Sequence, residues 1–435
     1  METNILKQIF FDHHGHWDAF VKKYSYRIRS VVIKEIDKFR GCGDPKHGFK
    51  FFVCEGCHDI KIVPYRCKGR FCTTCSSGET EEWSRLMAED VLQVNHRHII
   101  FTIDEGLRAV FQKYRKMLKE FMNEAVRIIQ NWFKKKMKVV PGIIAGLHTF
   151  GARVNFNPHV HMLVTMGGMK ENGEWQGYDY VPFTMLRKQW QNVVLKLIRR
   201  SLNDQEKKKV QPLLQKAYTA NGKGFYIYAP RQKGNVKEQL KYIGRYIRRP
   251  AIALHRIEEY DGEFVTFKYV DKNNGQEKRE KITVEEFIGR LIQHIPEEQF
   301  KTIRYYGIYS RRIKAICKKV IATWQKEVQK WIVKVKKTIT RRNWQQRIKE
   351  QTGKDPMVCP YCKCYYEYKG EVCLEERQLV IKHASCQTAR TCLERVIYDL
   401  TGIKASKTQQ KEEKITKQKR YRPSYEFSQL YLFGV

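Results

Sequence analysis

The pattern of apolar and polar positions along the chain predicts a protein of mixed helices and strands. Apolar residues recur at spacings of three and four in several stretches, which is typical of helices with one buried face. Helices are expected within residues 5–40, 111–133, 172–218, 236–249 and 287–292. Short apolar runs between turn-forming residues are typical of strands. Strands are expected at residues 97–103, 143–150, 154–164, 225–228, 265–269, 281–284 and 302–306. This pattern fits the α+β class, with some strands paired as antiparallel hairpins.

One expected hairpin carries a pair of histidines. His159 and His161 follow an Asn-Pro turn and are separated by one apolar residue. On a strand, both side chains therefore point to the same face, and two imidazoles on one face make half of a metal site. The neighbouring antiparallel strand places His148 beside the pair. There it could be the third ligand, or a histidine whose ring is satisfied within the core.

Two tyrosines lie off the apolar face of a later predicted helix. The apolar stripe of this helix consists of Val236, Leu240, Ile243 and Ile247. Tyr242 and Tyr246 are four residues apart and share a face that lies roughly 90° or more from the stripe. The same face carries Lys241, Arg245 and Arg249, which we expect to contact DNA. A histidine metal pair with paired tyrosines suggests metal-assisted attack of a tyrosine on a phosphodiester.

Cysteines near the amino end have the spacing of a zinc site. Cys54 and Cys57 form one Cys-x-x-Cys pair, and fourteen residues separate it from a second pair, Cys72 and Cys75. At this spacing two knuckles supply four thiolates to one structural zinc ion. The additional candidates, which could extend this site or form another, are Cys42 and Cys67 with His47 or His58. Basic residues of the loops, such as Arg70, would face phosphates.

The rest of the chain divides by composition into three expected regions. Residues 1–85 would hold a helical segment and the zinc-binding domain, and residues 86–315 the histidine and tyrosine pairs. Residues 316–435 are strongly basic, and we expect a helical region with a mobile tail at 405–422. Within it, Cys359 and Cys362 hint at a second zinc knuckle. The helical stretch 172–218 would be a spacer or an insert that faces DNA.

The charge of the chain points to an anionic partner. There are 83 Lys and Arg against 46 Asp and Glu, which gives a formal charge of +37. Nucleic acid is the partner we expect, although a membrane surface or a ribosome would also neutralise this charge. The 24 Tyr and 22 Phe residues supply rings for stacking on unpaired bases. The sequence has no leader-like start and no apolar run long enough to cross a bilayer, so we expect a cytoplasmic protein without membrane contact. In that reducing compartment, metal binding by cysteine is favoured over disulfides.

Several short segments of the chain occur in one characteristic order. They are residues 42–75 with Cys67-Lys68-Gly69-Arg70-Phe71-Cys72, residues 97–102, residues 148–151 leading into 157–161, residues 242–246, residues 286–294 and residues 303–307. In this order they resemble the two-tyrosine HUH rolling-circle transposases of the bacterial insertion-sequence ninety-one group, which carry an N-terminal zinc-binding domain.

The resemblance implies an HUH endonuclease domain like that of rolling-circle replication initiators, with the histidines on an antiparallel sheet and the tyrosine helix beside it. His159 and His161 would bind Mg²⁺ or Mn²⁺, and Tyr242 and Tyr246 would be the nucleophiles. The family more often has Gln at position 148, and either side chain can coordinate a metal. The implied activity nicks and rejoins single-stranded element ends through 5′-phosphotyrosine in the bacterial nucleoid. No Walker-type loop appears, so no nucleotide cofactor is expected.

Two other functions fit parts of the pattern. A rolling-circle replication initiator or a relaxase would use the same chemistry for another purpose. A zinc-dependent DNA-binding protein without enzymatic activity would keep the histidines and tyrosines as core or solvated residues. Metal-dependent nicking of single-stranded DNA separates these two classes.

Overall fold

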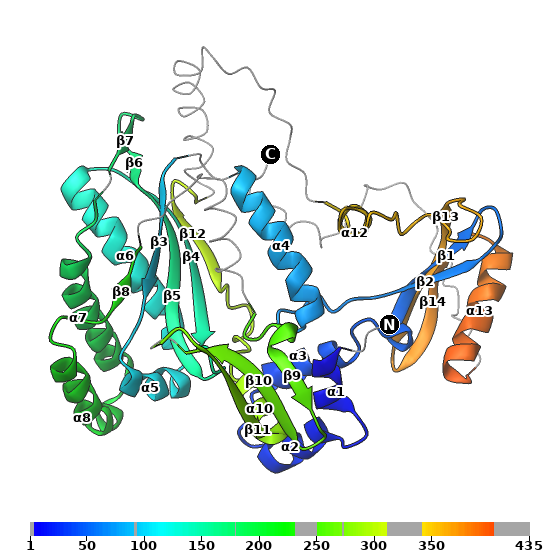
Figure 1. The fold of residues 1–435 in the computed structure, drawn as a ribbon, viewed down its shortest axis with the longest axis horizontal. Coiled ribbons are helices and arrows are strands. Elements are labelled where there is room, and N and C mark those ends of the chain that lie inside the picture. The colour runs from blue at the N-terminus through cyan, green and yellow to red at the C-terminus, as the bar shows by residue number, and fades with distance from the viewer. Residues whose placement is uncertain are drawn as a thin grey trace, which may run out of the picture. The chain divides into compact units, whose positions relative to one another are not determined.

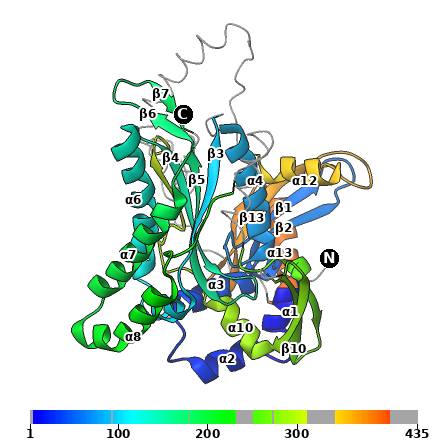
Figure 2. The same ribbon diagram turned by 60° about the vertical axis from the view of Figure 1, so that its left-hand side comes forward.

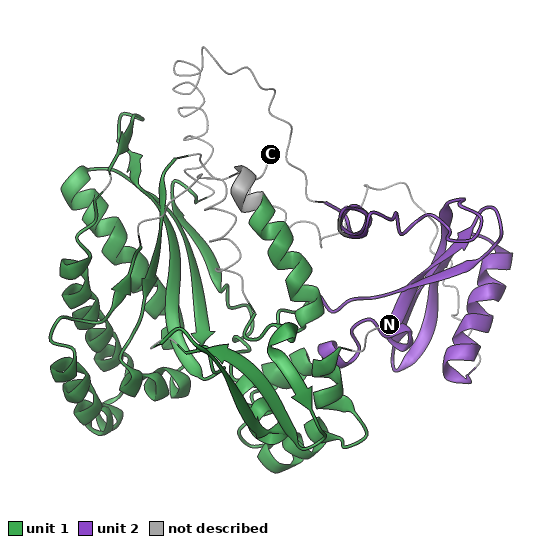
Figure 3. Ribbon diagram, in the orientation of Figure 1, with its two compact units in different colours: residues 1–37, 69–339 green, residues 38–68, 340–435 purple. Residues whose placement is uncertain are grey.

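A computed structural model describes residues 4–90, 94–178, 180–230, 250–271, 274–310 and 342–403 of the chain. The chain forms two compact units, each assembled from two separate stretches (Figure 3). Unit 1 consists of residues 1–37 and 69–339, and unit 2 of residues 38–68 and 340–435. This division differs from the three consecutive regions expected from the sequence, since residues 38–68 belong with the carboxyl-terminal part.

The centre of unit 1 is a five-stranded antiparallel sheet with the strand order β12-β4-β5-β3-β8 (Figures 1 and 2). The strands are β3 (His96–Phe101), β4 (Gly142–Phe150), β5 (Phe156–Thr165), β8 (Ile227–Tyr228) and β12 (Ile303–Gly307). Every pairing in this sheet is antiparallel. The expectation of a mixed fold with antiparallel sheets is confirmed. A two-stranded ribbon, β6 (Gly167–Met169) with β7 (Trp175–Gly177), follows β5.

Helices cover one face of this sheet, as Figure 2 shows for α6, α7 and α8. They are α5 (Arg108–Lys113), α6 (Met117–Met137), α7 (Phe183–Ser201) and α8 (Asp204–Ala220). Alternate strand residues such as Val160 and Met162 pack with Phe121 of α6 and Trp190 of α7 in one core. Trp190 has no exposed surface, so the stretch 172–218 is a structural part of this unit rather than a spacer. The single helix expected at 111–133 is two helices, because Tyr114 leaves the helical conformation between α5 and α6.

Helix α4 (Thr73–Asp90) lies on the side of the sheet away from α6 and α7 (Figure 1). The indole N–H of Trp83, which is almost fully buried, donates a hydrogen bond of 3.2 Å to the hydroxyl of Tyr305 on β12. The sheet therefore has a second face that is also covered over part of its area.

Three short helices open the chain, and a small antiparallel sheet follows the region of β8. The helices are α1 (Ile5–Phe11), α2 (His16–Tyr24) and α3 (Ser30–Arg40). The sheet consists of β9 (Ile257–Tyr260), β10 (Phe264–Val270) and β11 (Glu277–Thr283), and helix α10 (Val284–Ile292) comes next. The hairpin expected around Asn274-Gly275 is confirmed as β10 and β11.

Unit 2 is a four-stranded sheet of order β14-β13-β1-β2 with a helix packed against it. Its elements are β1 (Gly48–Cys54), β2 (Ile60–Pro64), α12 (Trp344–Thr352), β13 (Tyr366–Glu375), β14 (Gln378–Ala384) and α13 (Gln387–Thr401). Within the region expected to be basic and helical after residue 316, β13 and β14 are strands. The basic composition of the region as a whole did not reveal these strands, of which β14 has three consecutive buried apolar residues, Leu379 to Ile381.

Several predictions fall on residues that the structure does not describe. These are Tyr242, Tyr246, Lys241, Arg245, Arg249 and the tail at 405–422.

Candidate active site

The hairpin of β4 and β5 brings three histidines together. His148 is the cross-strand partner of His159, and His161 lies opposite Gly146, two positions further along the same face. The ring centroids are 5.4 Å apart for His148 and His159, 4.4 Å for His148 and His161, and 4.8 Å for His159 and His161. One ring nitrogen of each lies within 4.8 Å of the others. The three can therefore contact one ion.

The face of the sheet that carries these rings follows from strand alternation. Val160 and Met162 point into the core with the helices, so His159 and His161 point to the opposite face. His148 and His161 are buried, with exposed fractions of 6% and 4%, whereas His159 is only partly covered. A site with two buried imidazoles and a more open third one can hold an ion and still admit a substrate.

Hydrogen bonds orient two of the rings. The Nδ1 atom of His159 lies 2.7 Å from the carbonyl oxygen of Asn157, and a carbonyl only accepts. Nδ1 of His159 therefore carries the proton, which leaves the Nε2 lone pair for a metal. His161 is oriented by His98 of β3, whose Nε2 atom lies 2.9 Å from His161 Nδ1. Burial, together with the nearby His159, lowers the pKa of His98 to about 4, so His98 is neutral near pH 7.

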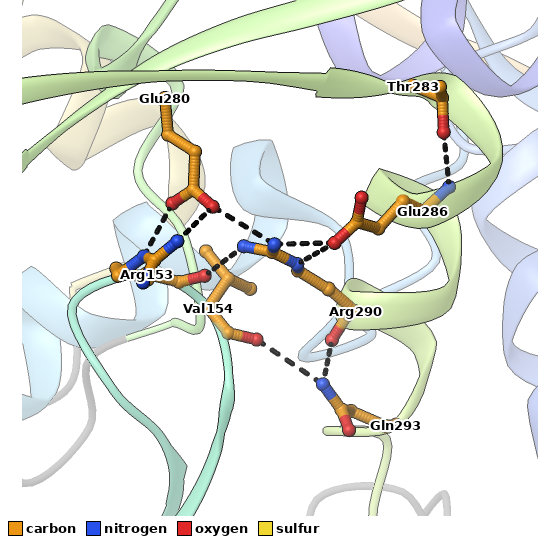
Figure 4. Close-up of polar contacts among 7 residues, drawn as sticks. All are labelled: Arg153, Val154, Glu280, Thr283, Glu286, Arg290 and Gln293. Atoms are coloured by element: carbon orange, nitrogen blue, oxygen red, sulfur yellow. Dashed lines mark hydrogen bonds and ion pairs between the residues drawn. The ribbon is translucent and has the colours of Figure 1, made fainter.

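The turn between β4 and β5 is held in an unusual conformation. Val154 has a φ of 59°, which is rare for a β-branched residue, and its side chain is fully buried. Its carbonyl accepts from Nε2 of His294 at 2.9 Å. It also accepts from Nε2 of Gln293 at 3.3 Å (Figure 4). Both donors lie just after α10. These bonds stabilise the turn that sets the register of His148 against His159.

A carboxylate fixes the same turn from the other side. Glu280 of β11 accepts from Arg153 through bonds of 2.8 and 2.7 Å, and from Arg290 of α10 at 3.0 Å (Figure 4). Arg290 also donates to the carbonyl of Arg153 at 3.0 Å. The guanidinium of Arg153, and then that of Arg290, hold the pKa of Glu280 below its usual range. The small sheet, α10 and the histidine hairpin are thus joined through one ion-pair network.

The cysteines form two groups of four. Cys54 and Cys57 lie with Cys359 and Cys362, and the sulfurs of each group are within 4.8 Å of one another. The second group consists of Cys42, Cys67, Cys72 and Cys75. The expected pairing of the first Cys-x-x-Cys with the second is therefore not the one in the structure. Strand β1, which ends at Cys54, pairs with β13, and this pairing brings the Cys-x-x-Cys that precedes β13 beside the first one.

The first group has the electrostatics of a site that needs a cation. A backbone N–H of Cys364 lowers the pKa of Cys362 to about 6. For Cys57, the backbone N–H of Asp59 acts to lower the pKa, but burial and the neighbouring thiols raise it to about 12. Thiols this close cannot all ionise by themselves, whereas a metal ion stabilises all four as thiolates. Within the described part of the chain, neither His47 nor His58 belongs to either group.

Two family models match the chain. A model described as "Putative transposase" matches residues 142–317, and one described as "Transposase zinc-binding domain" matches residues 12–103. The transposase for insertion sequence element IS801 of Pseudomonas savastanoi pv. phaseolicola is 28% identical over 302 residues, which cover 66% of this chain and 72% of that protein. The chain belongs to the IS91 family of transposases. An enzyme of this family cuts and joins DNA, so DNA is its partner.

A second relative of the transposase is the putative transposase y4qJ of Sinorhizobium fredii (strain NBRC 101917 / NGR234). It is 23% identical over 336 residues, which cover 71% of this chain and 81% of that protein. No solved structure matches the transposase. None of its described helices combines the length and the apolar character needed to span a membrane. The zinc-binding domain and the cysteine groups support structural Zn²⁺.

The structure of the transposase adds residues that the sequence did not single out. His98 is one, since a histidine within an apolar strand is usually a satisfied core residue. Another group, Asp12, His14 and His16, contacts the turn between β9 and β10: Asp12 and His16 bond the hydroxyl of Tyr260, and His16 also bonds the carbonyl of Gly262. These hydrogen bonds connect α1 and α2 to the small sheet.

The remaining predicted site residue with a described position is Arg70, whose side chain is exposed.

Proposed function

We propose that this transposase nicks and rejoins single-stranded DNA through 5′-phosphotyrosine intermediates and moves its insertion sequence by a rolling-circle-like mechanism. The observation that carries the proposal is the convergence of His148, His159 and His161 on one face of the β4–β5 hairpin. Three imidazoles, of which hydrogen bonds orient those of His159 and His161, suit a divalent cation that must also bind phosphate oxygens. When bound, Mg²⁺ or Mn²⁺ would polarise the scissile phosphate and stabilise the charge that develops on it.

The protein's own residues prepare this site. His159 keeps its proton on Nδ1, bonded to the Asn157 carbonyl, and so presents Nε2. The hydrogen bond between Nδ1 of His161 and Nε2 of His98 orients the His161 ring, which makes His98 a positioning residue. The partly covered His159 leaves the scissile phosphate a way in.

The nucleophiles of the proposal are Tyr242 and Tyr246, which lie outside the described residues. The phenol oxygen of one tyrosine attacks phosphorus, the bond from phosphorus to the 3′ oxygen breaks, and the phenol proton leaves while the 3′ oxygen gains one. Lys241, Arg245 and Arg249 would bind DNA phosphates and favour loss of that phenol proton. Because the phosphotyrosine ester conserves the energy of the phosphodiester bond that was broken, resealing needs no nucleotide cofactor. The second tyrosine, one helical turn away, would cut the next strand while the first remains joined.

The test is adduct formation on labelled single-stranded DNA from the ends of the protein's own element. The protein is incubated with Mn²⁺, with Mg²⁺ or with a chelator, resolved under denaturing conditions, and the adducted peptide is identified by mass spectrometry. We expect a metal-dependent adduct on Tyr242 or Tyr246 that is lost in the variant Tyr242→Phe with Tyr246→Phe. The matched control is Tyr218→Phe, which changes an exposed tyrosine of α8.

Adducts of equal yield in the double variant would overturn the tyrosine assignment. DNA binding without cleavage of either element end would favour the zinc-dependent DNA-binding function. Cleavage only at a replication origin or transfer origin would favour the initiator or relaxase.

A further inference from the structure

Two Cys-x-x-Cys stretches that lie about 300 residues apart in the sequence bring four sulfur atoms together in unit 2. The Sγ atoms of Cys54 and Cys362 are 3.3 Å apart, and those of Cys57 and Cys359 are 3.6 Å apart. Zinc–sulfur bonds of about 2.3 Å place tetrahedral ligands about 3.7 Å from each other, whereas a disulfide joins sulfurs at about 2.05 Å. The observed separations are therefore those of sulfurs that share one ion.

The two Cys-x-x-Cys turns have the same backbone geometry. The N–H of His58 donates to the carbonyl of Cys54 at 3.1 Å, and the N–H of Lys363 donates to the carbonyl of Cys359 at 3.1 Å. His58 and Lys363, each directly after the second cysteine of its pair, have positive φ values of 61° and 66°. Two unrelated stretches of sequence thus build one turn twice.

A further hydrogen bond repeats in both turns. The N–H of Cys54 donates to the carbonyl of Asp59 at 2.9 Å, and the N–H of Cys359 donates to the carbonyl of Cys364 at 2.8 Å. Gly56 lies against this arrangement, because a Cβ atom there would come within 2.6 Å of the Cys364 sulfur. The glycine keeps the space between the turns open. Two turns with the same hydrogen bonds and the same positive φ are expected of a pair of zinc knuckles. A chance contact between two loops would not produce this similarity.

We infer that Cys54 and Cys57, before the histidine hairpin in the sequence, and Cys359 and Cys362, after it, hold one structural zinc ion together. The zinc-binding family model covers residues 12–103 and so includes only half of these ligands. The carboxyl-terminal segment is then a component of the zinc-binding domain, in addition to whatever ion the group of Cys42 binds.

The packing of unit 2 supports a joint domain. Strand β1 lies between β2 and β13, with seven residue pairs in register along β13. Phe49 and Phe51 of β1 are fully buried together with Val372 of β13 and Leu393 of α13. Without residues 366–401, β1 would be an edge strand and these two rings would face water. The same segment that brings two zinc ligands therefore also completes the core.

The test counts zinc bound to the full-length purified protein and to three variants. They are Cys54→Ser with Cys57→Ser, Cys359→Ser with Cys362→Ser, and the fourfold combination. If the four thiolates share one ion, each variant binds one zinc fewer than the unsubstituted protein, and the fourfold variant loses no more than the double variants. A fourfold variant that loses two zinc ions, or none, would overturn the inference.

The matched control replaces two cysteines outside both groups, Cys386 at the cap of α13 and Cys392 within α13. The variant Cys386→Ser with Cys392→Ser should keep the full zinc count.

A second measurement needs no substitution, in case the variants do not fold. Cys57, Cys362 and Cys386 are all exposed. With zinc bound, iodoacetamide should modify Cys386 and spare Cys57 and Cys362. After chelation all four cysteines of the zinc site should react with iodoacetamide. If Cys57 and Cys362 react at the rate of Cys386 before chelation, the inferred zinc site is refuted. Neither readout depends on nuclease activity.

Discussion

The Nε2 atom of His98 on β3 lies 2.9 Å from the Nδ1 atom of His161 on β5, and the two rings are stacked at 19°. Strand β3 thereby supplies a hydrogen-bond partner for one ring of the histidine group. A second shell of this kind fixes the tautomer and orientation of a ligand, and its loss typically weakens metal binding by 10–100-fold.

Replacing His98 should therefore change metal dependence more than the rate at saturating metal. For His98→Leu we expect the Mn²⁺ concentration for half-maximal nicking to rise by about 10–100-fold. For His98→Gln, whose amide can still form a hydrogen bond, this concentration should rise less. The control is His96→Leu, which removes a buried ring of the same strand that bonds Tyr309 at 2.6 Å instead. An equal rise in all three variants would mean that His98 only stabilises the sheet.

The ion pairs of Glu280 should make stability depend on pH. The pKa of Glu280 is lowered in the folded protein, so its contribution is fully present above the unfolded value of about 4.3 and is lost as the pH falls through the folded pKa. Glu280→Gln should lower the free energy of unfolding by about 1–3 kcal/mol at pH 7. The difference from the unsubstituted protein should shrink below about pH 4, as measured by urea unfolding across pH.

A neighbouring carboxylate serves as the control for this network. Glu286 also bonds Arg290, at 2.5 Å, but half of its side chain is exposed (50%), against 11% for Glu280. Glu286→Gln should cost no more than about 1 kcal/mol because an exposed pair gains little. Equal losses for the two variants would show that burial does not set the strength of this network.

Gly307 should tolerate no side chain. It ends β12 with a φ of 59°, and a Cβ atom would lie 1.8 Å from the carbonyl oxygen of Pro141. Gly307→Ala should lower the free energy of unfolding by more than about 3 kcal/mol, since backbone strain of about 1–2 kcal/mol adds to this collision. Gly275→Ala is the control, because Gly275 has a φ of 70° with nothing within 4 Å of its Cβ position. Thermal unfolding of both variants distinguishes collision from strain, and similar shifts in Tm would contradict the predicted collision.

Affinity for single-stranded DNA should fall steeply with salt. The formal charge of +37 favours many phosphate contacts, and each contributes a slope of about −0.7 in log affinity against log salt. With about five contacts, raising the salt from about 50 to about 200 mM weakens binding by about a hundredfold. Fluorescence anisotropy with a chelator present measures this without cleavage. A change below about fivefold would argue against a backbone-dominated interface.

The histidine hairpin was predictable because its determinants are local. Strand alternation puts His159 and His161 on one face, and the short turn fixes the antiparallel register that sets His148 opposite His159. His98 could not be singled out in this way, since its contact with His161 depends on which strand pairs with the other edge of β5. Nothing in an apolar strand marks one histidine as a support for another.

The zinc ligands were predicted as residue types but grouped wrongly. A spacing of fourteen residues between Cys57 and Cys72 is compatible with one zinc site, so the local rule gave a plausible pairing. The structure groups Cys54 and Cys57 with Cys359 and Cys362 because β1 pairs with β13, and a pairing across so long a stretch leaves no periodic pattern in the sequence.

The pairing of β1 with β13 also has a consequence for synthesis on the ribosome. Strand β1 ends at Cys54 and β13 begins at Tyr366, so about 300 residues must be translated between them. At about 5–20 residues per second, this takes on the order of 15–60 s. Throughout that time Phe49 and Phe51 have no completed core to enter. The nascent transposase therefore exposes the unpaired edge of β1 during this time. A message broken before codon 366 yields a protein whose unit 2 lacks β13, β14 and α13.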